Sequence, residues 1–512
     1  MAWRRIVGLS LLMLGFAAVS GAAEKPTLAD AAEQRNKALI RTLLNAGADV
    51  NAAQADGTTA LHWAVYNDDT ETVQLLVRSR ANVNAANRYG VPPLSLACTN
   101  GNVELVKLLL AAGADPNASL QGGETVLMTA ARAGNIDAVK ALLARGASVN
   151  TRERLDQTAL MWAAAEGHAA VVQALIDAGA DVHAKLKSGF TPLFFATREG
   201  HIEVTRTLLK SGVNVNELLQ RESGGPILAV NEPVRNGTSP LMMAVENGHF
   251  ELALALIDAG ADPNDRRSGF TPLHAINWVR KPDASDSGDP APVGSGRLTS
   301  LQFVRALVER GANVNARLDK NAPRVPSAGS AIKTEGSTPF LMAADRADLP
   351  LMRLLLELGA DPLLPNADNT TPLMAAAGLG TVNPLEEAGT ETESLEAVQL
   401  LLKLGADINA VDNNGDTAMH GAAYANFATM VQLLTDRGSD PKIWNQRNKE
   451  GRTPLFIAEG YRGGGRSTVH RPTIDALTRL IRAAGLSTEG ERPAIKDVYE
   501  RPAAPAAKPP QP

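Results

Sequence analysis

Short apolar helical segments recur along the chain, and each is followed by residues that end a helix. Residues 106–110 (VKLLL) form one such segment, and the loop GADPN at residues 113–117 follows it. Similar loops occur at residues 47–51 (GADVN) and 405–409 (GADIN). The glycine can adopt the left-handed conformation that stops a helix, and Asp and Asn favour a tight turn. The pattern predicts many short helices separated by turns.

A second pattern marks the beginning of another helix at regular intervals. Thr59, Pro92, Thr125, Thr158 and Thr191 lie 33 residues apart. Six further anchors occur at Ser239, Thr271, Thr338, Thr371, Thr417 and Thr453. The residues around Thr191 read GFTPLFFA, and those around Thr271 read GFTPLH. Proline loses no useful hydrogen bond in a first helical turn, and a Thr hydroxyl can accept from backbone N–H groups there. Each anchor therefore predicts a helix start.

This 33-residue pattern resembles the ankyrin repeat, whose signature is Thr-Pro-Leu-His-x-Ala. Eleven anchors and an incomplete opening repeat from Thr27 to Asn51 extend the resemblance over about nine-tenths of the chain. The resemblance implies an all-α fold, an ankyrin-repeat α-solenoid of about twelve repeats spanning residues 27–486. Each repeat would be a short β-hairpin finger followed by two antiparallel helices. One repeat cannot bury its apolar face alone, so stacking would provide the stability.

Four segments lengthen the spacing beyond 33 residues. Residues 217–236 and 317–335 would enlarge fingers, whereas residues 280–298 and 378–394 would separate the two helices of a repeat. Insertions in repeat proteins map to loops, often on the binding face. Neutral variation of surface loops is an equally open interpretation.

The two ends of the chain differ from the repeats. Arg4 and Arg5, the apolar residues 6–19 and the small residues 20–23 predict a secretory signal peptide, residues 1–23, cleaved after Ala23. The mature protein would then be periplasmic or secreted and would have no membrane attachment. An uncleaved anchor and a twin-arginine signal are the minor alternatives. Residues 487–512 are rich in Pro and Ala, and such a tail is expected to be disordered.

Composition narrows the chemistry that the chain can perform. The net charge of −5 favours neither a nucleic-acid partner nor an anionic membrane. Aromatic residues make up only 4%, so we expect a core of Ala, Leu and Val. Cys98 is the single cysteine, which rules out an intramolecular disulfide and a zinc site with two cysteine ligands. It is expected to be a buried, inert thiol.

No catalytic, cofactor-binding or metal-binding residues are expected, because seven of the eight histidines occupy recurring positions of the repeat. His62, His274 and His420 stand at the signature histidine, His168, His201 and His249 lie between the two helices, and His183 lies in the loop. Only His470 lacks such an explanation. Residues 460–467 (GYRGGGRS) approach a phosphate-binding loop, but Arg466 stands where that loop requires lysine.

The resemblance places the variable positions at the finger tips and at the ends of the first helices, lining one concave face. The candidate partner-binding residues are Tyr66, Tyr89, Arg132, Glu166, Phe190, Arg198, Phe270, Trp278 and Tyr424. Tyr, Trp and Arg are frequent anchors of interfaces. Phe190, Phe270 and Trp278 could instead pack against neighbouring repeats or insertions.

These observations favour a non-enzymatic scaffold that binds another exported protein of unknown identity through this face. No nucleic acid or cofactor is expected, and the oligomeric state stays open. Two alternatives remain. One is a secreted effector that binds a host protein. The other, more remote, is a ligand-binding or enzymatic role that uses the insertions as a lid.

Overall fold

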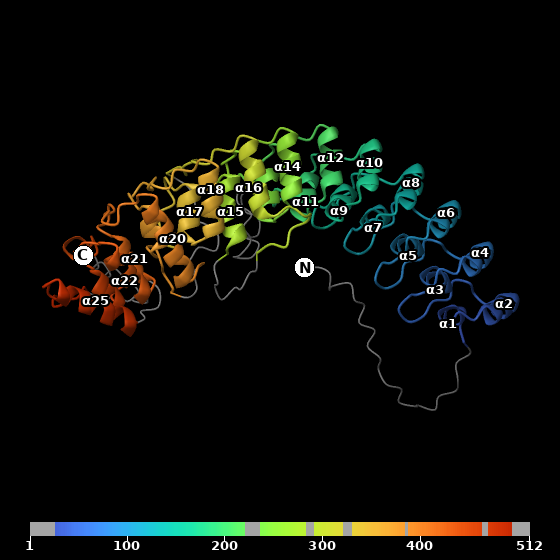
Figure 1. The fold of residues 1–512 in the computed structure, drawn as a ribbon. Coiled ribbons are helices and arrows are strands. Elements are labelled where there is room, and N and C mark those ends of the chain that lie inside the picture. The colour runs from blue at the N-terminus through green and yellow to red at the C-terminus, as the bar shows by residue number, and fades with distance from the viewer. Residues whose placement is uncertain are drawn as a thin grey trace, which may run out of the picture. The chain divides into compact units, whose positions relative to one another are not determined.

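The computed structural model describes six stretches of the chain. They are residues 26–220, 236–282, 291–320, 330–384, 388–462 and 469–493. The expected signal peptide, the tail beyond residue 493 and the middle of each insertion lie outside the described residues. The described residues form 25 α-helices and only isolated β-bridges, which makes the fold all-α (Figure 1). The chain divides into two compact units, Met1–Ser148 and Val149–Pro512.

Unit 1 contains four helix pairs. They are α1 (Leu28–Glu33) with α2 (Lys37–Asn45), α3 (Ala60–Tyr66) with α4 (Thr70–Arg78), α5 (Pro93–Asn100) with α6 (Val103–Ala111), and α7 (Val126–Arg132) with α8 (Ile136–Ala144). The first helices of the pairs pack side by side, and α4, α6 and α8 form a second row. Unit 1 is therefore a two-layered stack of helical hairpins.

Unit 2 repeats this arrangement with eight more pairs. Its first helices are α9 (Ala159–Ala165), α11 (Pro192–Glu199), α13 (Pro240–Glu246), α15 (Pro272–Arg280), α17 (Pro339–Asp345), α19 (Pro372–Ala376), α21 (Ala418–Tyr424) and α24 (Pro454–Ala458). Their partners are α10 (Ala169–Asp177), α12 (Ile202–Lys210), α14 (Phe250–Asp258), α16 (Ser300–Glu309), α18 (Leu349–Glu357), α20 (Glu391–Lys403), α22 (Ala428–Asp436) and α25 (Arg471–Ala483). The short α23 (Pro441–Trp444) precedes the last finger.

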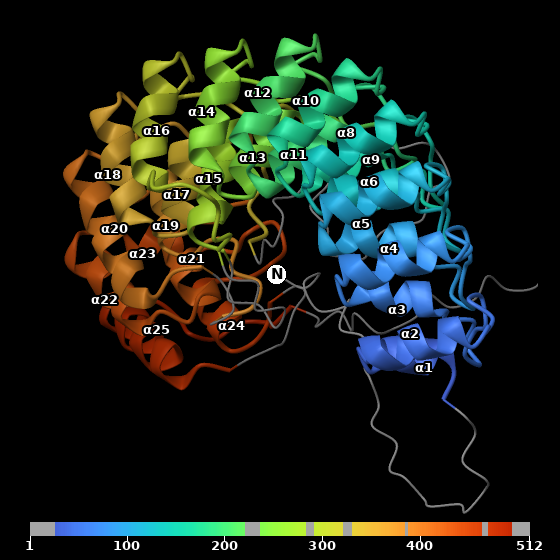
Figure 2. The same cartoon turned by 90° about the vertical axis from the view of Figure 1, so that its right-hand side faces the viewer.

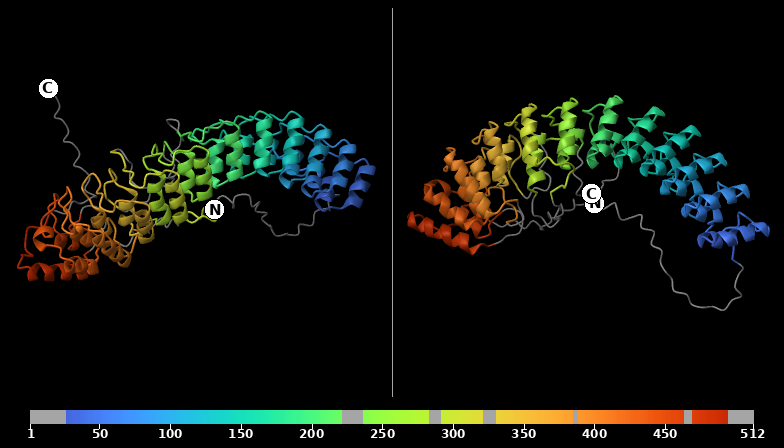
Figure 3. Two further views of the ribbon diagram at one scale, coloured as in Figure 1. Left: turned by 45° about the horizontal axis from the view of Figure 1, so that its top comes forward. Right: turned by 45° about the vertical axis from the view of Figure 1, so that its right-hand side comes forward.

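The two rows of unit 2 lie on opposite sides of a curve. In Figure 2 the first helices α11, α13, α15, α17, α19 and α21 lie on its inner side, and the second helices lie on its outer side. Both views of Figure 3 show the pairs of unit 2 following one another in chain order. The first helices therefore line the inner face of this unit.

The predicted helix starts are confirmed. All eleven anchors are N-cap residues of first helices. Thr125 shows the reason, because its hydroxyl accepts a hydrogen bond from the backbone N–H of Met128 at 3.2 Å. Such a cap contributes about 1 kcal/mol. The predicted helix ends are confirmed as well: Gly113 follows α6 with φ 93°, a conformation that a side chain disfavours.

The core contains more aromatic side chains than the composition suggested. Small residues such as Ala163 and Ala164 are fully buried, as expected. Large rings fill the wider gaps between repeats, and Phe250 stacks on Phe303 with ring centroids 4.9 Å apart. Trp444 and Phe340 are also fully buried. Most of the few aromatic side chains are therefore used for packing.

The fingers differ from the expected β-hairpins. In the first complete finger, the Gln54 N–H donates to Thr58 O at 2.9 Å and the Gly57 N–H donates to Gln54 O at 2.8 Å. Neighbouring fingers are joined by single bonds, such as Arg88 N to Asp56 O at 2.7 Å. These bonds are enough to close a turn, but they are too few to form a ladder between strands. The described fingers are therefore tight turns with isolated bridges.

The loop asparagines do more than favour a turn. Asn84 Nδ2 donates to Gly113 O at 3.0 Å, and its Oδ1 accepts from Asp115 N at 2.8 Å, so one side chain binds the next repeat twice. The same pair of bonds is made by Asn117, Asn150, Asn216, Asn264 and Asn315. His183 and Leu363 occupy this position in two repeats. Neither of their side chains makes a corresponding bond within the described residues.

Candidate functional site

The signature histidines are structural. His62 Nδ1 accepts from the backbone N–H of Thr59 at 3.2 Å, which leaves Nε2 to donate to Val91 O at 2.9 Å. The ring therefore joins a helix start to the next finger, and it does so in the neutral form. His274 Nδ1 lies 2.7 Å from the Thr271 hydroxyl and its Nε2 lies 3.2 Å from Ser337 O, and burial lowers the pKa of its imidazole to about 4.

The histidines between helices bind the preceding repeat. His201 Nε2 lies 3.0 Å from Ala165 O, and His249 Nε2 lies 2.8 Å from Arg198 O. Both residues are N-caps of second helices. His470, which had no role in the repeat pattern, is likewise the N-cap of α25, and its Nδ1 lies 2.8 Å from Thr473 Oγ1. It thus has a structural contact at a helix start.

The remaining candidates for chemistry also have structural surroundings. Cys98 is fully buried, and burial raises the pKa of its thiol to about 12. The described residues contain no group of three or more His, Cys, Asp or Glu side chains that could hold a metal ion. Residues 463–468 of the phosphate-loop-like motif lie outside the described residues. Arg462 just before them is buried and donates to Ala423 O at 3.2 Å and Tyr424 O at 2.5 Å.

Unit 1 exposes two pairs of contacting side chains, Trp63 with Tyr66 and Arg88 with Tyr89, which we together call the tyrosine patch. The side chains of Tyr66 and Tyr89 are 55% and 57% exposed. The Tyr66 ring meets Trp63 edge-on at 5.8 Å, and the Arg88 guanidinium lies 5.2 Å from the centre of the Tyr89 ring. Arg88 also donates to the Tyr89 hydroxyl at 3.0 Å. These contacts hold the rings while more than half of each tyrosine side chain remains exposed.

Three of the expected contact residues are buried instead. Phe270 is 0% exposed, and Phe190 and Trp278 are each 7% exposed. The ring of Phe270 packs edge-on against Trp278 at 5.0 Å, and that of Phe190 lies 5.3 Å from Phe195. The expectation that these three side chains face a partner is therefore wrong. Packing within the stack, the other role that the sequence left open, is the one observed, because burying a large apolar ring stabilises the fold.

Charged members of the expected set are more accessible. Glu166 is exposed at the end of α9. Arg198 pairs with Glu199 at 2.8 Å, and its guanidinium lies 5.4 Å from the centre of the Phe190 ring.

Arg132 is engaged with its own repeat and Tyr424 with the next one. Arg132 pairs with Glu124 of the preceding finger at 3.2 Å. Tyr424 is half-buried and accepts from Arg452 at 3.3 Å, and burial raises the pKa of its hydroxyl.

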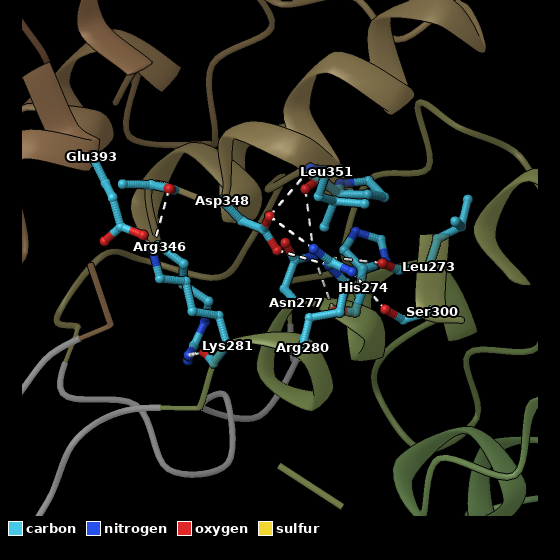
Figure 4. Close-up of polar contacts among 12 residues, drawn as sticks. Leu273, His274, Asn277, Arg280, Lys281, Ser300, Arg346, Asp348, Leu351 and Glu393 are labelled. Carbon is cyan, nitrogen blue, oxygen red and sulfur yellow. Dashed lines mark hydrogen bonds and ion pairs between the residues drawn. The ribbon is translucent and has the colours of Figure 1, made fainter. Parts of the chain in front are cut away.

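A polar network lies at the end of the first helix α15, at the edge of unit 2 opposite the fingers. Arg280, the last residue of α15, makes two bonds to the Asp348 carboxylate, at 2.8 and 3.1 Å, and one to Ser300 Oγ at 2.5 Å (Figure 4). Asp348 also accepts from the Leu351 N–H and so caps α18. This cluster connects α15, α16 and α18.

The network continues to the next insertion. Lys281 Nζ lies 2.9 Å from Glu393 Oε1 and donates to Ala347 O at 3.3 Å (Figure 4). The buried Arg346 donates to the Lys281 carbonyl. Glu393 closes the capping box of α20 by accepting from Thr390 N at 2.8 Å. The described ends of the insertions at residues 280–298 and 378–394 therefore meet.

The C-terminal end of the insertion at residues 280–298 packs against the preceding helix pair rather than against the following one. Ser295 Oγ lies 2.9 Å from His249 Nδ1, and the N–H groups of Arg297 and Leu298 donate to Glu251 Oε1 at 2.5 and 2.7 Å. Residues 291–298 thus run back over the preceding helix pair. Sequence reasoning missed these contacts, since nothing in the 33-residue spacing pairs an insertion with a neighbouring repeat.

One shallow groove lies outside the inner face. It separates the second helices α16 and α18, has a volume of about 550 Å³, and is lined by apolar residues such as Leu301, Leu349 and Leu354. Arg305 spans it to Glu357 at 2.7 Å. Across the described stretches, no helix is both long and apolar enough to cross a bilayer.

Comparison with known proteins agrees with the repeat pattern. A family model described as ankyrin repeats (3 copies) matches residues 28–119, 127–218 and 385–466, more than half of the chain. A single-repeat model, described as ankyrin repeat, matches residues 236–267.

Individual relatives are similar over shorter stretches. The ankyrin repeat and LEM domain-containing protein 1 homolog of Caenorhabditis elegans is 40% identical over 73 residues, which are 14% of this chain and 10% of that protein. The putative ankyrin repeat protein FPV219 of Fowlpox virus (strain NVSL) is 31% identical over 125 residues, 21% of this chain and 29% of that protein. The putative ankyrin repeat protein L86 of Acanthamoeba polyphaga mimivirus is 33% identical over 106 residues, 19% and 18% of the two chains. The chain thus spans less than a third of the length of each of these curated relatives.

Proposed function

Because this chain belongs to the ankyrin-repeat family, we propose that it is a non-enzymatic scaffold that holds another exported protein against its fingers and first helices. Ankyrin repeats generally mediate protein–protein interaction. The residues most often used for chemistry, six of the eight histidines and Cys98, are engaged in packing or in hydrogen bonds within the fold. The side chains left for a ligand are those at the variable positions.

The observation that carries this proposal is the exposure of the tyrosine patch. Most of the larger rings of the protein are wholly or partly buried, whereas Tyr66 and Tyr89 are more than half exposed. A tyrosine offers a large contact area and a hydroxyl while losing little conformational entropy on binding, which is why it is frequent in interfaces. The contacts with Trp63 and Arg88 hold both rings before a partner arrives.

The proposed place of action is outside the cytoplasm, and residues 1–23 support it. Fractionation of cells that produce the protein, followed by N-terminal sequencing of the mature chain, tests this part. We expect a chain that begins at Glu24 in the periplasm or the medium. A cytoplasmic chain that retains Met1 would refute the exported role while leaving the scaffold role open.

The partner itself is accessible by affinity purification of the tagged mature protein from the periplasmic fraction, followed by mass spectrometry. We expect a specific protein to be recovered with the wild type and lost with the Tyr66→Ala/Tyr89→Ala variant. The control variant Leu404→Ala/Val469→Ala removes two exposed apolar side chains elsewhere and should retain the partner. Equal recovery with all three proteins would contradict the role of the patch, and turnover of a substrate by the pure protein would contradict the scaffold.

A further inference from the structure

The fingers at the beginning of unit 2 are basic, although the chain as a whole carries a net charge of −5. These fingers comprise residues 151–157, 184–190, 217–220, 265–270 and 316–320. They contain eight basic residues, and all eight side chains are exposed: Arg152, Arg154, Lys185, Lys187, Arg266, Arg267, Arg317 and Lys320. We call this set the basic finger edge.

Of the five acidic residues of the same fingers, one is buried, three are half-buried and Asp319 is exposed. Asp265 is buried and accepts from Arg267 Nε at 2.6 Å. Glu217 accepts from the Thr191 hydroxyl at 2.5 Å. Glu153 accepts from two backbone N–H groups of its own turn, those of Leu155 and Gln157. These carboxylates already have partners within the repeats, and with eight basic and five acidic residues the fingers keep an excess of positive charge.

Most of the cations are therefore available. Among the described residues, Arg154, Lys185, Lys187 and Lys320 form no ion pair, whereas Arg266 pairs with Asp319 at 3.2 Å and Arg267 with Asp265 at 2.6 Å.

Hydrogen bonds to neighbouring fingers hold two of the cations without neutralising them. Arg152 and Arg317 donate to the backbone carbonyls of Lys185 and Pro365 at 3.2 and 2.7 Å. The three complete fingers of unit 1 lack this charge, because residues 52–58, 85–91 and 118–124 contain one basic and two acidic side chains.

We propose that the basic finger edge binds an extended, acidic segment of a partner protein. This inference rests on the proposed scaffold function and adds the chemistry of the ligand. Packed helices lie about 8–10 Å apart, so successive finger tips recur at roughly that spacing. An extended chain advances about 3.3 Å per residue, so carboxylates at every third residue come level with successive fingers. Four of the five fingers supply cations, and the described part of the third, residues 217–220, supplies none. Leu155, 59% exposed beside Arg154, offers an apolar contact between the charges.

A protein segment fits this edge better than a single-stranded nucleic acid does. Nucleic-acid grooves combine cations with aromatic rings on which bases stack. The aromatic residues of these fingers, Phe190 and Phe270, are buried. The edge thus offers charge and one aliphatic side chain but no stacking platform.

The test measures binding of labelled synthetic peptides to the full mature protein by fluorescence anisotropy. One peptide has 18 residues with Glu at every third position, separated by Ser and Gly, and a second has the same composition with its glutamates clustered at one end. The variant Arg154→Ser/Lys185→Ser/Lys187→Ser removes three cations of the edge. The control variant Lys210→Ser/Lys403→Ser/Arg437→Ser removes one Arg and two Lys, all exposed near the ends of second helices.

We expect the spaced peptide to bind more tightly than the clustered one. Its affinity should fall about tenfold between 50 and 200 mM salt, because salt screens exposed charges, and about tenfold in the edge variant, with no change in the control. An absence of binding, or an equal loss in both variants, overturns the inference. Tighter binding of a single-stranded oligonucleotide of equal charge, in competition with the peptide, does so too and assigns the edge to nucleic acid.

Recovery of the natural partner by the edge variant distinguishes a failure of this inference from a failure of the proposed function. If the edge variant recovers that partner from the periplasmic fraction as well as the wild type does, the acidic-segment inference fails and the scaffold stands. If no partner is recovered by any variant but the spaced peptide binds as described, the scaffold proposal fails and the edge remains an anion-binding surface.

Discussion

The guanidinium of Arg280 and the carboxylate of Asp348 form a paired set of hydrogen bonds between two consecutive repeats, at 2.8 and 3.1 Å. The side chains are only 16% and 5% exposed. Asp348 caps α18 at the same time. In ordinary repeats a polar side chain at the start of the second helix binds the preceding repeat, as His249 does. In the repeat split by residues 280–298, Arg280 joins its own first helix to the next repeat instead.

Breaking this pair should destabilise unit 2. Arg280→Met leaves the Asp348 carboxylate buried without its counterion, and removing one partner of a buried pair costs about 3–5 kcal/mol. The matched control is Arg310→Met, which breaks a similar two-bond pair with Asp258 at the surface, where such pairs contribute about 0–1 kcal/mol. Urea titrations of both variants measure the difference. Equal midpoints for the two variants would show that the buried pair has no special role.

Much of the fold was predictable because its determinants are local. A Thr-Pro pair caps a helix wherever it occurs, and a glycine after a helix ends it, so the anchors gave the helix starts directly. The pairing of Arg280 with Asp348 was not predictable, since the two residues are 68 positions apart and lie on either side of an insertion. The burial of Phe270 was missed for a related reason. The ring at this finger position turns toward the first helices and packs there, Phe270 against Trp278 and Phe190 against Phe195, and these contacts depend on the folded arrangement.

The pH dependence of stability follows from the buried histidines. Burial lowers the pKa of His274 and of His420 from 6.5 to about 4. Between these values the unfolded chain binds protons that the folded protein does not bind. Stability should therefore be complete above pH 6.5 and fall on acidification toward pH 4, by about 1.4 kcal/mol per pH unit for each histidine. Denaturant titrations across this range measure the slope, and imidazole NMR signals of both residues that titrate near pH 6.5 would contradict the prediction.

Two buried carboxylates oppose this trend. Burial raises the pKa of Asp412 and of Asp416, so at neutral pH their ionised forms destabilise the folded state, and acidification relieves that cost. Asp412→Asn/Asp416→Asn should steepen the loss of stability between pH 6.5 and 4. The double variant thus shows the pH dependence due to the two histidines without the opposing contribution of the two carboxylates.

A charge placed inside the stack should disrupt it, whereas the same charge on a finger should not. Leu160 in α9 is 1% exposed, and Leu160→Asp would bury a carboxylate with no partner, which costs several kcal/mol. Leu155, five residues earlier, is 59% exposed, so Leu155→Asp should change the melting temperature little. Circular dichroism melts of the two variants compare them directly. An unchanged melt for Leu160→Asp would argue against stacked repeats.

Placing an asparagine at residue 363, one of the two loop positions that lack it, should increase stability. Asn264 binds Gly311 O at 2.9 Å and Asn313 N at 2.7 Å, and Leu363 occupies the equivalent position before the repeat that contains Gly405 and Asp407. Leu363→Asn should restore both bonds and remove an apolar side chain that is 44% exposed. Since a hydrogen bond contributes about 0.5–1.5 kcal/mol net, and less at the surface, we expect a gain of about 1 kcal/mol.

The opposite change at an intact position is the control. Asn264→Leu should lose a similar amount, because it recreates at residue 264 the interruption found at residue 363. Hydrogen exchange of the Asp407 and Asn313 amides reports each position separately, which matters in a repeat protein whose parts can open independently. Slower exchange at Asp407 in Leu363→Asn, with faster exchange at Asn313 in Asn264→Leu, is the expected pair of results. If Leu363→Asn leaves Asp407 exchange unchanged, the asparagine bonds follow from stacking and do not contribute to it.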